Sequence, residues 1–415
     1  MIIAGAGLAS AIAIKPRDEG EGYSDYFRGL NDELKANGAL KPSMLVDLNR
    51  LNHNIEALKA TLVENYRVVV KSLPSPGLLS YIMEKAGTNR LMVFHQPFVS
   101  HIAETFPQSD MLIGKPLPVR NAEIFYERFS GASGFDPSVQ LQWLIDTKER
   151  LDEYQTLAAK LGTKMRINVE IDVGLHRGGL QNPTDLIPLV DQILADPEHL
   201  EFAGLMGYDP HVVKVPRIIK SPQKAYEQSQ FLYQGFLDIL DKYPRIDHST
   251  LCLNGAGSPT LNLHKQGTAA NDISAGSCLV KPTDFDIPTL EEFMPAAFIA
   301  TPVLKKLDGT NLPSAEALKG IFSLWDPNRQ QTYFIYGGKW MANYESPAGL
   351  RDNSLYGYST NQQMVNGSFR TALEVNDHIF LRPHQSEFVF LQFGDLLAIR
   401  DGKVVDHWPI LKQNT

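Results

Sequence analysis

Residues 66–72 have the sequence YRVVVKS, a short β-branched run that ends in a lysine. Helix-length segments with apolar residues at helical spacing, such as 78–86, 148–161 and 186–196, alternate with runs of this kind. Because a crossover between parallel strands needs about a dozen residues, the alternation predicts parallel strands. There are eight such runs, at 66–70, 91–94, 111–113, 141–145, 166–171, 201–207, 250–253 and 272–280.

Eight strands separated by helices predict an α/β protein with a (β/α)8 TIM barrel, and a doubly wound open sheet is the alternative. After residue 281 four prolines break the pattern, and an Asp-Gly turn at 401–402 joins two strand-like runs. We therefore expect three parts: a leader and linker at 1–40, the barrel at 41–281, and a C-terminal, mostly antiparallel β domain at 282–415. The strand-like runs of the last part are 320–325, 331–336, 378–381, 388–391, 396–399 and 404–407.

The composition is that of an ordinary globular protein. The 415 residues are 43% hydrophobic and 21% charged, with a formal charge of −8. An acidic balance without a Lys/Arg-rich run argues against nucleic-acid binding, and the two cysteines exclude a disulfide framework. Beyond the N-terminus, no apolar stretch is long enough to span a membrane.

Residues 1–14, MIIAGAGLASAIAI, are apolar and rich in small residues. A dinucleotide-binding fingerprint is disfavoured because position 10 is serine and Pro16 interrupts the helix that the fingerprint needs. The stretch is either the apolar part of an export signal or a frayed leader. The expected location is therefore cytoplasmic or, with an export signal, periplasmic.

In a barrel, chemistry lies at the carboxyl ends of the strands. Lys71 ends the first strand, where its amine either forms an imine or is a solvated loop residue. Tyr208, after the sixth strand, either stacks on a planar cofactor or caps the core. Small residues follow the last two strands, in NGAGSPT at 254–260 and in Gly276-Ser277, and predict a phosphate cradle. A lysine and a phosphate cradle around one barrel mouth point to pyridoxal 5′-phosphate.

The order of these motifs resembles the fold-type III pyridoxal phosphate-dependent enzymes, with their alanine racemase-like barrel, over about residues 40–410. Within that family it looks like the D-serine dehydratase and D-threonine aldolase branch. The motifs are MLVDLNRLNHNI at 44–55, VVVK at 68–71, EIDVGLHRGG at 170–179, GLMGYD at 204–209, GAGS at 255–258 and DISAGS at 272–277.

The resemblance implies a role for each matching residue. Lys71 would form the Schiff base, Arg177 would lie near the phenolic oxygen of the cofactor, and Tyr208 would lie beside its ring. The phosphate would be held by Gly255, Gly257, Ser258, Gly276 and Ser277. The resemblance also implies a homodimer in which the β domain of one subunit covers the barrel mouth of the other.

The chain departs from the family where the dehydratases and aldolases carry a metal on a His-x-Cys or His-x-Asp pair. Residues 381–387 are LRPHQSE, so without a gap the two ligand positions fall on Gln385 and Glu387. His384 with Glu387 is the weak alternative for a metal pair. No metal is expected, and Gln385, Glu387 and His384 are instead predicted to contact the substrate. His378 and His407 are predicted to be surface residues.

These features predict a lyase that acts on D-amino acids with a β-hydroxyl group, as a D-serine dehydratase or a D-threonine aldolase does. An amino acid racemase is the first alternative, and it would need a second base, for which Tyr336 and Tyr356 are candidates. A non-catalytic pyridoxal phosphate-binding protein is the second alternative. The substantial β domain counts against it, because such proteins typically have a single domain.

Overall fold

The computed structural model describes residues 15–38, 41–62, 64–216, 218–310, 314 and 323–414. The predicted leader, residues 1–14, lies outside the described residues. The chain forms two compact units. The barrel unit comprises residues 50–294, 386–391 and 409–415, and the β unit comprises the rest. The sequence predicts a linear division at residue 281, whereas the β unit also contains the first strand, near the N-terminus.

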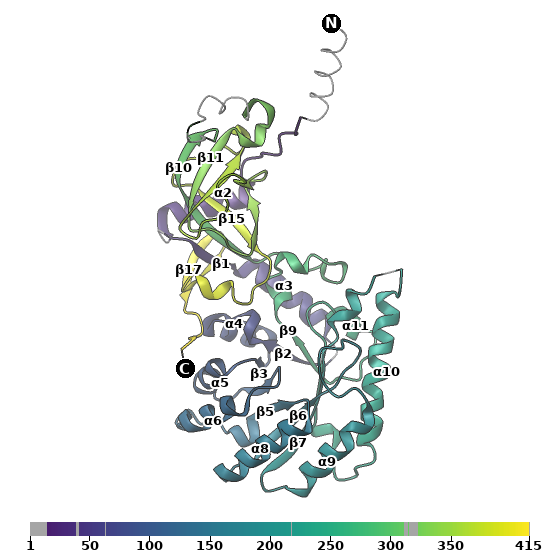
Figure 1. Cartoon of the computed structure of the whole chain (residues 1–415). Helices are drawn as coiled ribbons and strands as arrows, with labels where there is room; N and C mark the ends of the chain where they lie inside the picture. The colour runs from purple at the N-terminus through teal and green to yellow at the C-terminus, as the bar shows by residue number, and fades with distance from the viewer. Residues whose placement is uncertain are drawn as a thin grey trace. The chain divides into compact units, whose positions relative to one another are not determined.

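Eight parallel strands form a closed barrel in the first unit, which confirms the predicted fold (Figure 1). Neighbours in the chain are neighbours in the barrel, and the last strand pairs with the first to close it. The strands are β2 (Asn65–Val69), β3 (Arg90–Val93), β4 (Asp110–Ile113), β5 (Leu141–Ile145), β6 (Met165–Glu170), β7 (Leu200–Gly207), β8 (Cys252–Gly255) and β9 (Asp272–Ala275).

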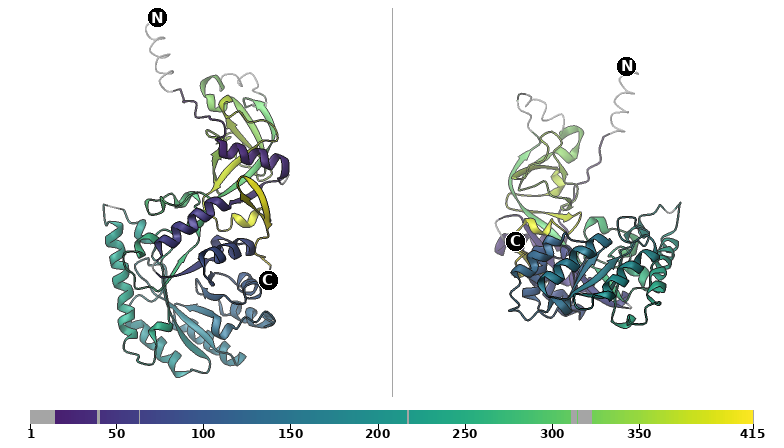
Figure 2. Two further views of the ribbon diagram at one scale, coloured as in Figure 1. Left: turned by 180° about the vertical axis from the view of Figure 1, so that it is seen from behind. Right: turned by 60° about the horizontal axis from the view of Figure 1, so that its bottom comes forward.

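Helices surround the strands on the outside, as the views in Figure 2 show. Their apolar faces are buried because their leucine, isoleucine and phenylalanine residues recur at helical spacing. Thr147 caps the N-terminus of α8 and Gly162, with a positive φ, ends it, so the predicted bounds 148–161 are confirmed. The main helices are α3 (Leu48–Thr61), α4 (Pro76–Ala86), α5 (Gln96–Thr105), α6 (Val119–Arg128), α8 (Lys148–Leu161), α9 (Leu186–Ala195), α10 (Pro222–Leu240) and α11 (Leu261–His264).

The β unit is a mostly antiparallel sheet, as predicted, covered by α2 (Asp25–Asn37). Phe27, Leu30 and Leu34 of α2 pack on Phe298 and Phe380 of the sheet. Only the pair β1–β16 is parallel among the described strands of this unit. The strands are β1 (Ser43–Asp47), β10 (Ala297–Asp308), β11 (Gln331–Tyr336), β12 (Ala342–Ser346), β13 (Arg351–Asp352), β14 (Gln362–Gly367), β15 (His378–Pro383), β16 (Leu396–Arg400) and β17 (Lys403–Trp408).

The hairpin at 401–402 is confirmed: Asp401 and Gly402 both have a positive φ, as a tight turn between β16 and β17 requires. Two predicted strands are wrong. Residues 388–391 form a turn and a 3-10 helix within the barrel unit, and residues 323–325 are helical, while the rest of that run lies outside the described residues. Both runs are short and apolar, so their pattern alone does not distinguish a strand from a turn or a short helix.

Among the histidines of the β unit, His407 is exposed as predicted, but His378 is buried. It lies on β15, which pairs with β10 on one side and β12 on the other. Burial lowers the pKa of His378 to about 4, so the imidazole is neutral at pH 7. The His378 N–H donates to Asn31 Oδ1 of α2 at 2.8 Å, so His378 lies next to a helix that is distant in the sequence, which the local sequence does not reveal. In the part of the chain that the structure describes, no helix is both long and apolar enough to cross a lipid bilayer.

Candidate active site

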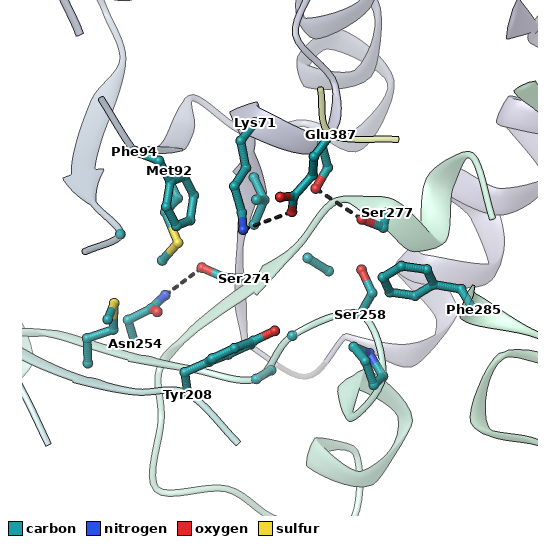
Figure 3. A pocket seen from close by; sticks show the side chains of 18 of the residues that line it. Lys71, Met92, Phe94, Tyr208, Asn254, Ser258, Ser274, Ser277, Phe285 and Glu387 are labelled. Carbon is teal, nitrogen blue, oxygen red and sulfur yellow. Dashed lines mark hydrogen bonds and ion pairs between the residues drawn. The ribbon is translucent and has the colours of Figure 1, made fainter. Parts of the chain in front are cut away.

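A pocket opens at the carboxyl ends of the barrel strands, where chemistry is expected in this fold (Figure 3). Residues that follow β2, β3, β4, β6, β7, β8 and β9 all contribute to its wall. Segments far apart in the chain therefore meet at one place because the barrel is closed. The polar residues that line the pocket are Lys71, Ser72, Arg177, Tyr208, Asn254, Ser258, Ser274, Ser277 and Glu387.

Lys71 lies in a 3-10 turn, Val70–Ser72, that directly follows β2. Its Nζ atom is 2.8 Å from Oε1 of Glu387 and 4.5 Å from the centroid of the Phe94 ring. The carboxylate and the ring face both stabilise the ammonium group, and 35% of the lysine side chain remains exposed. The predicted lysine is thus held at the pocket by two other lining residues.

The two segments rich in small residues lie side by side at the pocket, because Ser258 joins them. Its Oγ accepts hydrogen bonds from the backbone N–H groups of Gly276, at 3.2 Å, and Cys278, at 3.1 Å. The Ser277 hydroxyl lines the same pocket and donates to Ser72 Oγ at 3.0 Å. A Cβ atom on Gly276 would lie 2.9 Å from the Val69 carbonyl oxygen, so the backbone can be this close only at a glycine. Hydroxyl groups on a tightly packed, small-residue backbone fit a phosphate group.

Tyr208 and Arg177 lie together in the pocket, after β7 and β6 respectively. The guanidinium carbon of Arg177 is 5.0 Å from the centroid of the Tyr208 ring, a distance that permits a cation–π interaction. Burial raises the pKa of Tyr208, and the neighbouring arginine only partly opposes this. The phenol is therefore neutral at pH 7. A flat ring beside the small-residue segments fits a planar cofactor with a phosphate.

Gly257 controls how closely the Tyr208 ring approaches the cradle. A Cβ atom at this position would lie 2.6 Å from a ring carbon of Tyr208. We expect Gly257→Ala to displace the ring and to weaken binding of the predicted cofactor, pyridoxal phosphate, at least about tenfold, as misplaced cofactor-positioning groups do. An equilibrium titration that monitors the absorbance of the cofactor measures this affinity. Gly29→Ala on α2 is the control, because no atom lies within 4 Å of its Cβ position, and unchanged affinity in Gly257→Ala would contradict the prediction.

The charged stretch at 170–179 mainly builds the loop that carries Arg177. Asp172 accepts hydrogen bonds from the backbone N–H groups of Gly174, at 2.8 Å, and His176, at 3.0 Å, and its second oxygen is 2.7 Å from the His176 ring. Burial opposes ionisation of Asp172, but these hydrogen bonds outweigh it and lower the pKa of the carboxyl. Of this motif, only Arg177 reaches the pocket wall among the described residues.

A buried polar network that was not predicted from the sequence begins at the pocket wall, where Asn254 and Ser274 lie. Nδ2 of Asn254 donates to Oδ1 of Asp272 at 2.6 Å and to Oγ of Ser274 at 2.8 Å. Asp272 also accepts from Arg67 Nε and from Arg90 Nη1, both at 2.7 Å. Burial disfavours the charged carboxylate, but the two guanidinium groups overcome this and lower the pKa of Asp272. Because a carboxylate only accepts hydrogen bonds, it fixes the amide of Asn254 in one orientation.

A second buried group, also missed, supports the loop after β8. Asp209 accepts a hydrogen bond from Thr260 Oγ1 at 2.6 Å, and its other oxygen is 2.9 Å from Nε2 of His264. Asp209 and His264 are almost completely buried. The pair thus ties the residue that follows Tyr208 to the segment that follows Ser258. An aspartate directly after Tyr208 in the sequence was the available signal, but its partner is 55 residues away.

Of the three residues predicted to contact substrate, Glu387 lines the barrel pocket. Gln385 and His384 belong to the β unit, where Nε2 of His384 is 2.9 Å from Oδ1 of Asn343. Within the described ranges, no group of three or more His, Cys, Asp or Glu side chains is arranged to hold a metal ion. The role of Glu387 and the metal requirement both remain predictions.

The closed parallel barrel with a lysine and a small-residue cradle at its mouth defines the class of protein. Residues 46–283 match the family model described as alanine racemase, N-terminal domain. This match covers more than half of the chain, so the chain belongs to that family, the fold-type III pyridoxal phosphate-dependent group. The resemblance seen in the sequence is thereby confirmed.

Two alanine racemases from Helicobacter pylori are similar in sequence. The one from strain G27 is 27% identical over 231 residues, which cover 54% of this chain and 58% of the relative. The one from strain HPAG1 is 25% identical over 239 residues, covering 55% and 60%. The chain therefore matches little more than half the length of these relatives.

Solved structures share the fold at low sequence identity. D-threonine aldolase from Filomicrobium marinum has a TM-score of 0.69 at 15% identity, covering 89% of this chain and 96% of the other. Alanine racemase from Bacillus anthracis has a TM-score of 0.67 at 14% identity, covering 89% and 98%. D-threo-3-hydroxyaspartate dehydratase from Delftia sp. HT23 has a TM-score of 0.65 at 14% identity, covering 90% and 98%. These likenesses concern the fold and leave the reaction open.

Proposed function

We propose that this protein is a pyridoxal phosphate-dependent lyase that acts on D-amino acids with a β-hydroxyl group. The observation that carries the proposal is the pocket that brings Lys71 together with the small-residue cradle after β8 and β9. The aldolase and the dehydratase among the structural neighbours have the same fold, so the fold is compatible with this reaction class. We also propose a homodimer, as the family resemblance implies.

In this proposal each pocket residue has a defined role. Lys71 would hold the cofactor covalently, Ser258 and Ser277 would bind its phosphate, and Tyr208 and Arg177 would flank its ring. Bound pyridoxal phosphate supplies an electron sink that weakens the bonds at the α-carbon of an amino acid. The chain supplies binding, orientation and proton transfer. Lys71 Nζ would move a proton at the substrate α-carbon.

Among the described residues that line the pocket, Glu387 is the acidic one, and its Oε1 is 2.8 Å from Lys71 Nζ. A carboxylate in that place can accept the proton of a substrate hydroxyl, which promotes cleavage between the α- and β-carbons. If the β-hydroxyl leaves instead, the departing oxygen needs a proton; Glu387 can donate it only after taking up the proton that Lys71 would remove from the α-carbon. Its location beside Lys71 supports a lyase acting on β-hydroxy amino acids.

A racemase is the second candidate, favoured by the similarity to the Helicobacter pylori enzymes named alanine racemase. Racemisation needs a base on each side of the α-carbon. The candidates Tyr336 and Tyr356 are both exposed residues of the β unit. In a racemase, the β domain of a partner subunit would supply one of them as the second base.

Proton NMR of the cofactor-loaded protein with a panel of D-amino acids in heavy water tests the proposal. Glycine with an aldehyde is the expected product set for an aldolase, and a keto acid with ammonia is expected for a dehydratase. We expect a metal chelator to leave the rate unchanged, because no metal is predicted. Deuterium at the α-carbon with both enantiomers appearing would instead establish the racemase, and an unchanged spectrum would overturn the assigned reaction.

A further inference from the structure

A second cavity adjoins the pocket, and Lys71, Phe94 and Glu387 line both. The rest of its wall includes His95 and Lys115, which follow β3 and β4. In the closed barrel β3 and β4 lie on one side of β2, whereas the cradle strands β8 and β9 lie on the other. A molecule attached at Lys71 therefore has the phosphate cradle on one side and this second cavity on the other.

The second cavity combines an apolar wall with three charged side chains, those of Lys71, Lys115 and Glu387. Phe94, Phe388 and Leu391 supply apolar surface. Burial, together with the nearby Lys115, lowers the pKa of His95, so this imidazole is neutral at pH 7. Of the described residues that line the cavity, Lys115 is the cation that remains once Lys71 is engaged with a cofactor. In the proposed function Glu387 faces the substrate hydroxyl, so Lys115 is the group left for a carboxylate and the aromatic wall is left for an apolar side chain.

Phe388 combines an unfavourable backbone conformation with an exposed apolar side chain. Its φ of +39° lies where a bulky residue is rarely found, and 73% of its surface is exposed. The same turn, in which the Val389 N–H donates to the Glu387 carbonyl, places Glu387 against Lys71. Strain of this kind persists where the surrounding structure imposes it, typically at functional sites. An exposed ring at the edge of a cavity gains contact when an apolar ligand enters.

We propose that the second cavity is the substrate side of the site. Phe94, Phe388 and Leu391 would bind the side chain of a D-amino acid, and Lys115 would bind its carboxylate. The substrate class is then 3-hydroxy D-amino acids with a large apolar or aromatic side chain, rather than serine. This inference rests on the proposed function and makes its substrate more specific.

Titration of the cofactor-loaded protein with D-phenylalanine and D-alanine tests the inference without turnover, because cofactor absorbance reports binding. We expect D-phenylalanine to bind roughly ten- to a hundredfold more tightly, as burial of an aromatic side chain predicts. Phe388→Ala should remove about tenfold of that preference while the affinity for D-alanine stays the same. Phe388→Tyr should keep the preference. Lys115→Gln should weaken both amino acids to a similar degree, since both carry the carboxylate.

Phe231→Ala is the matched control, because Phe231 is an equally exposed phenylalanine on α10 and lines neither cavity. Equal affinities for the two amino acids in the wild type would overturn the inference, as would a preference that survives in Phe388→Ala. Cofactor loading is measured first and separately. If pyridoxal phosphate does not load, the proposed function fails and this inference falls with it. Loaded protein that shows no preference overturns only the inference.

Discussion

Lys71→Ala is expected to abolish covalent attachment of pyridoxal phosphate and to lower turnover of D-amino acids at least about a thousandfold. The reason is that one amine would serve both as the attachment point and as the base at the α-carbon. Lys71 is the lysine among the described residues that line the pocket, and Glu387 and Phe94 hold its Nζ atom there. Reduction with borohydride followed by mass spectrometry of the peptide that contains residue 71 detects the attachment directly.

Lys85→Ala is the control for this variant. Lys85 also follows β2 in the chain, on α4, but it lies outside the pocket wall and its Nζ is 3.8 Å from Glu84. It should therefore keep both the covalent cofactor and the activity. Covalently bound cofactor in Lys71→Ala, together with turnover, would show that another residue forms the Schiff base.

Arg67→Met should destabilise the barrel by about 3–5 kcal/mol, as removal of one partner from a buried ion pair does. The Arg67 side chain is completely buried. Besides Asp272, it donates to the carbonyl oxygens of Leu91, at 3.1 Å, and Asp110, at 2.8 Å. Without it, the buried Asp272 carboxylate keeps only part of its compensation, from Arg90 and Asn254. Urea unfolding at pH 7 measures the change in the free energy of unfolding.

Two further variants test whether the loss of stability comes from the buried ion pair. Arg120→Met, which removes an exposed arginine from α6, should leave stability nearly unchanged. The double variant Arg67→Met with Asp272→Asn should be more stable than the single variant, because it leaves no unpaired buried charge. If the single variant unfolds like the wild type, the ion pair does not contribute as proposed.

The contribution of the Arg67–Asp272 ion pair to stability should decrease at low pH. Burial opposes the charged form of Asp272, but the guanidinium groups lower its pKa in the folded protein below the ordinary value of about 3.9. The stabilisation is therefore fully present above that ordinary value and is lost as the pH falls through the lower folded pKa. The difference in the free energy of unfolding between the wild type and Arg67→Met should therefore become smaller as the pH falls through this range.

The alternation of apolar runs and amphipathic segments was sufficient to predict the barrel, because both periodicities are local properties of the chain. The same holds for α8, whose bounds are marked by the capping Thr147 and by Gly162. Lys71 and the two segments rich in small residues could be placed at the barrel mouth from the sequence, because residues that directly follow the strands of a barrel lie there. The hairpin at 401–402 was found because its turn depends on two adjacent residues.

Only the tertiary structure decided which distant residues meet. Glu387 lies against Lys71 although 316 positions separate them, and Arg67 and Asp272 form a buried pair across 205 positions. In the sequence, Arg67 is merely a charged residue inside an apolar run, and whether it points inward or outward depends on the barrel's closure. The β unit likewise draws β1 from the N-terminal part of the chain. Local patterns set the elements, whereas the pairing of buried charges is determined by which strands become neighbours when the sheet closes.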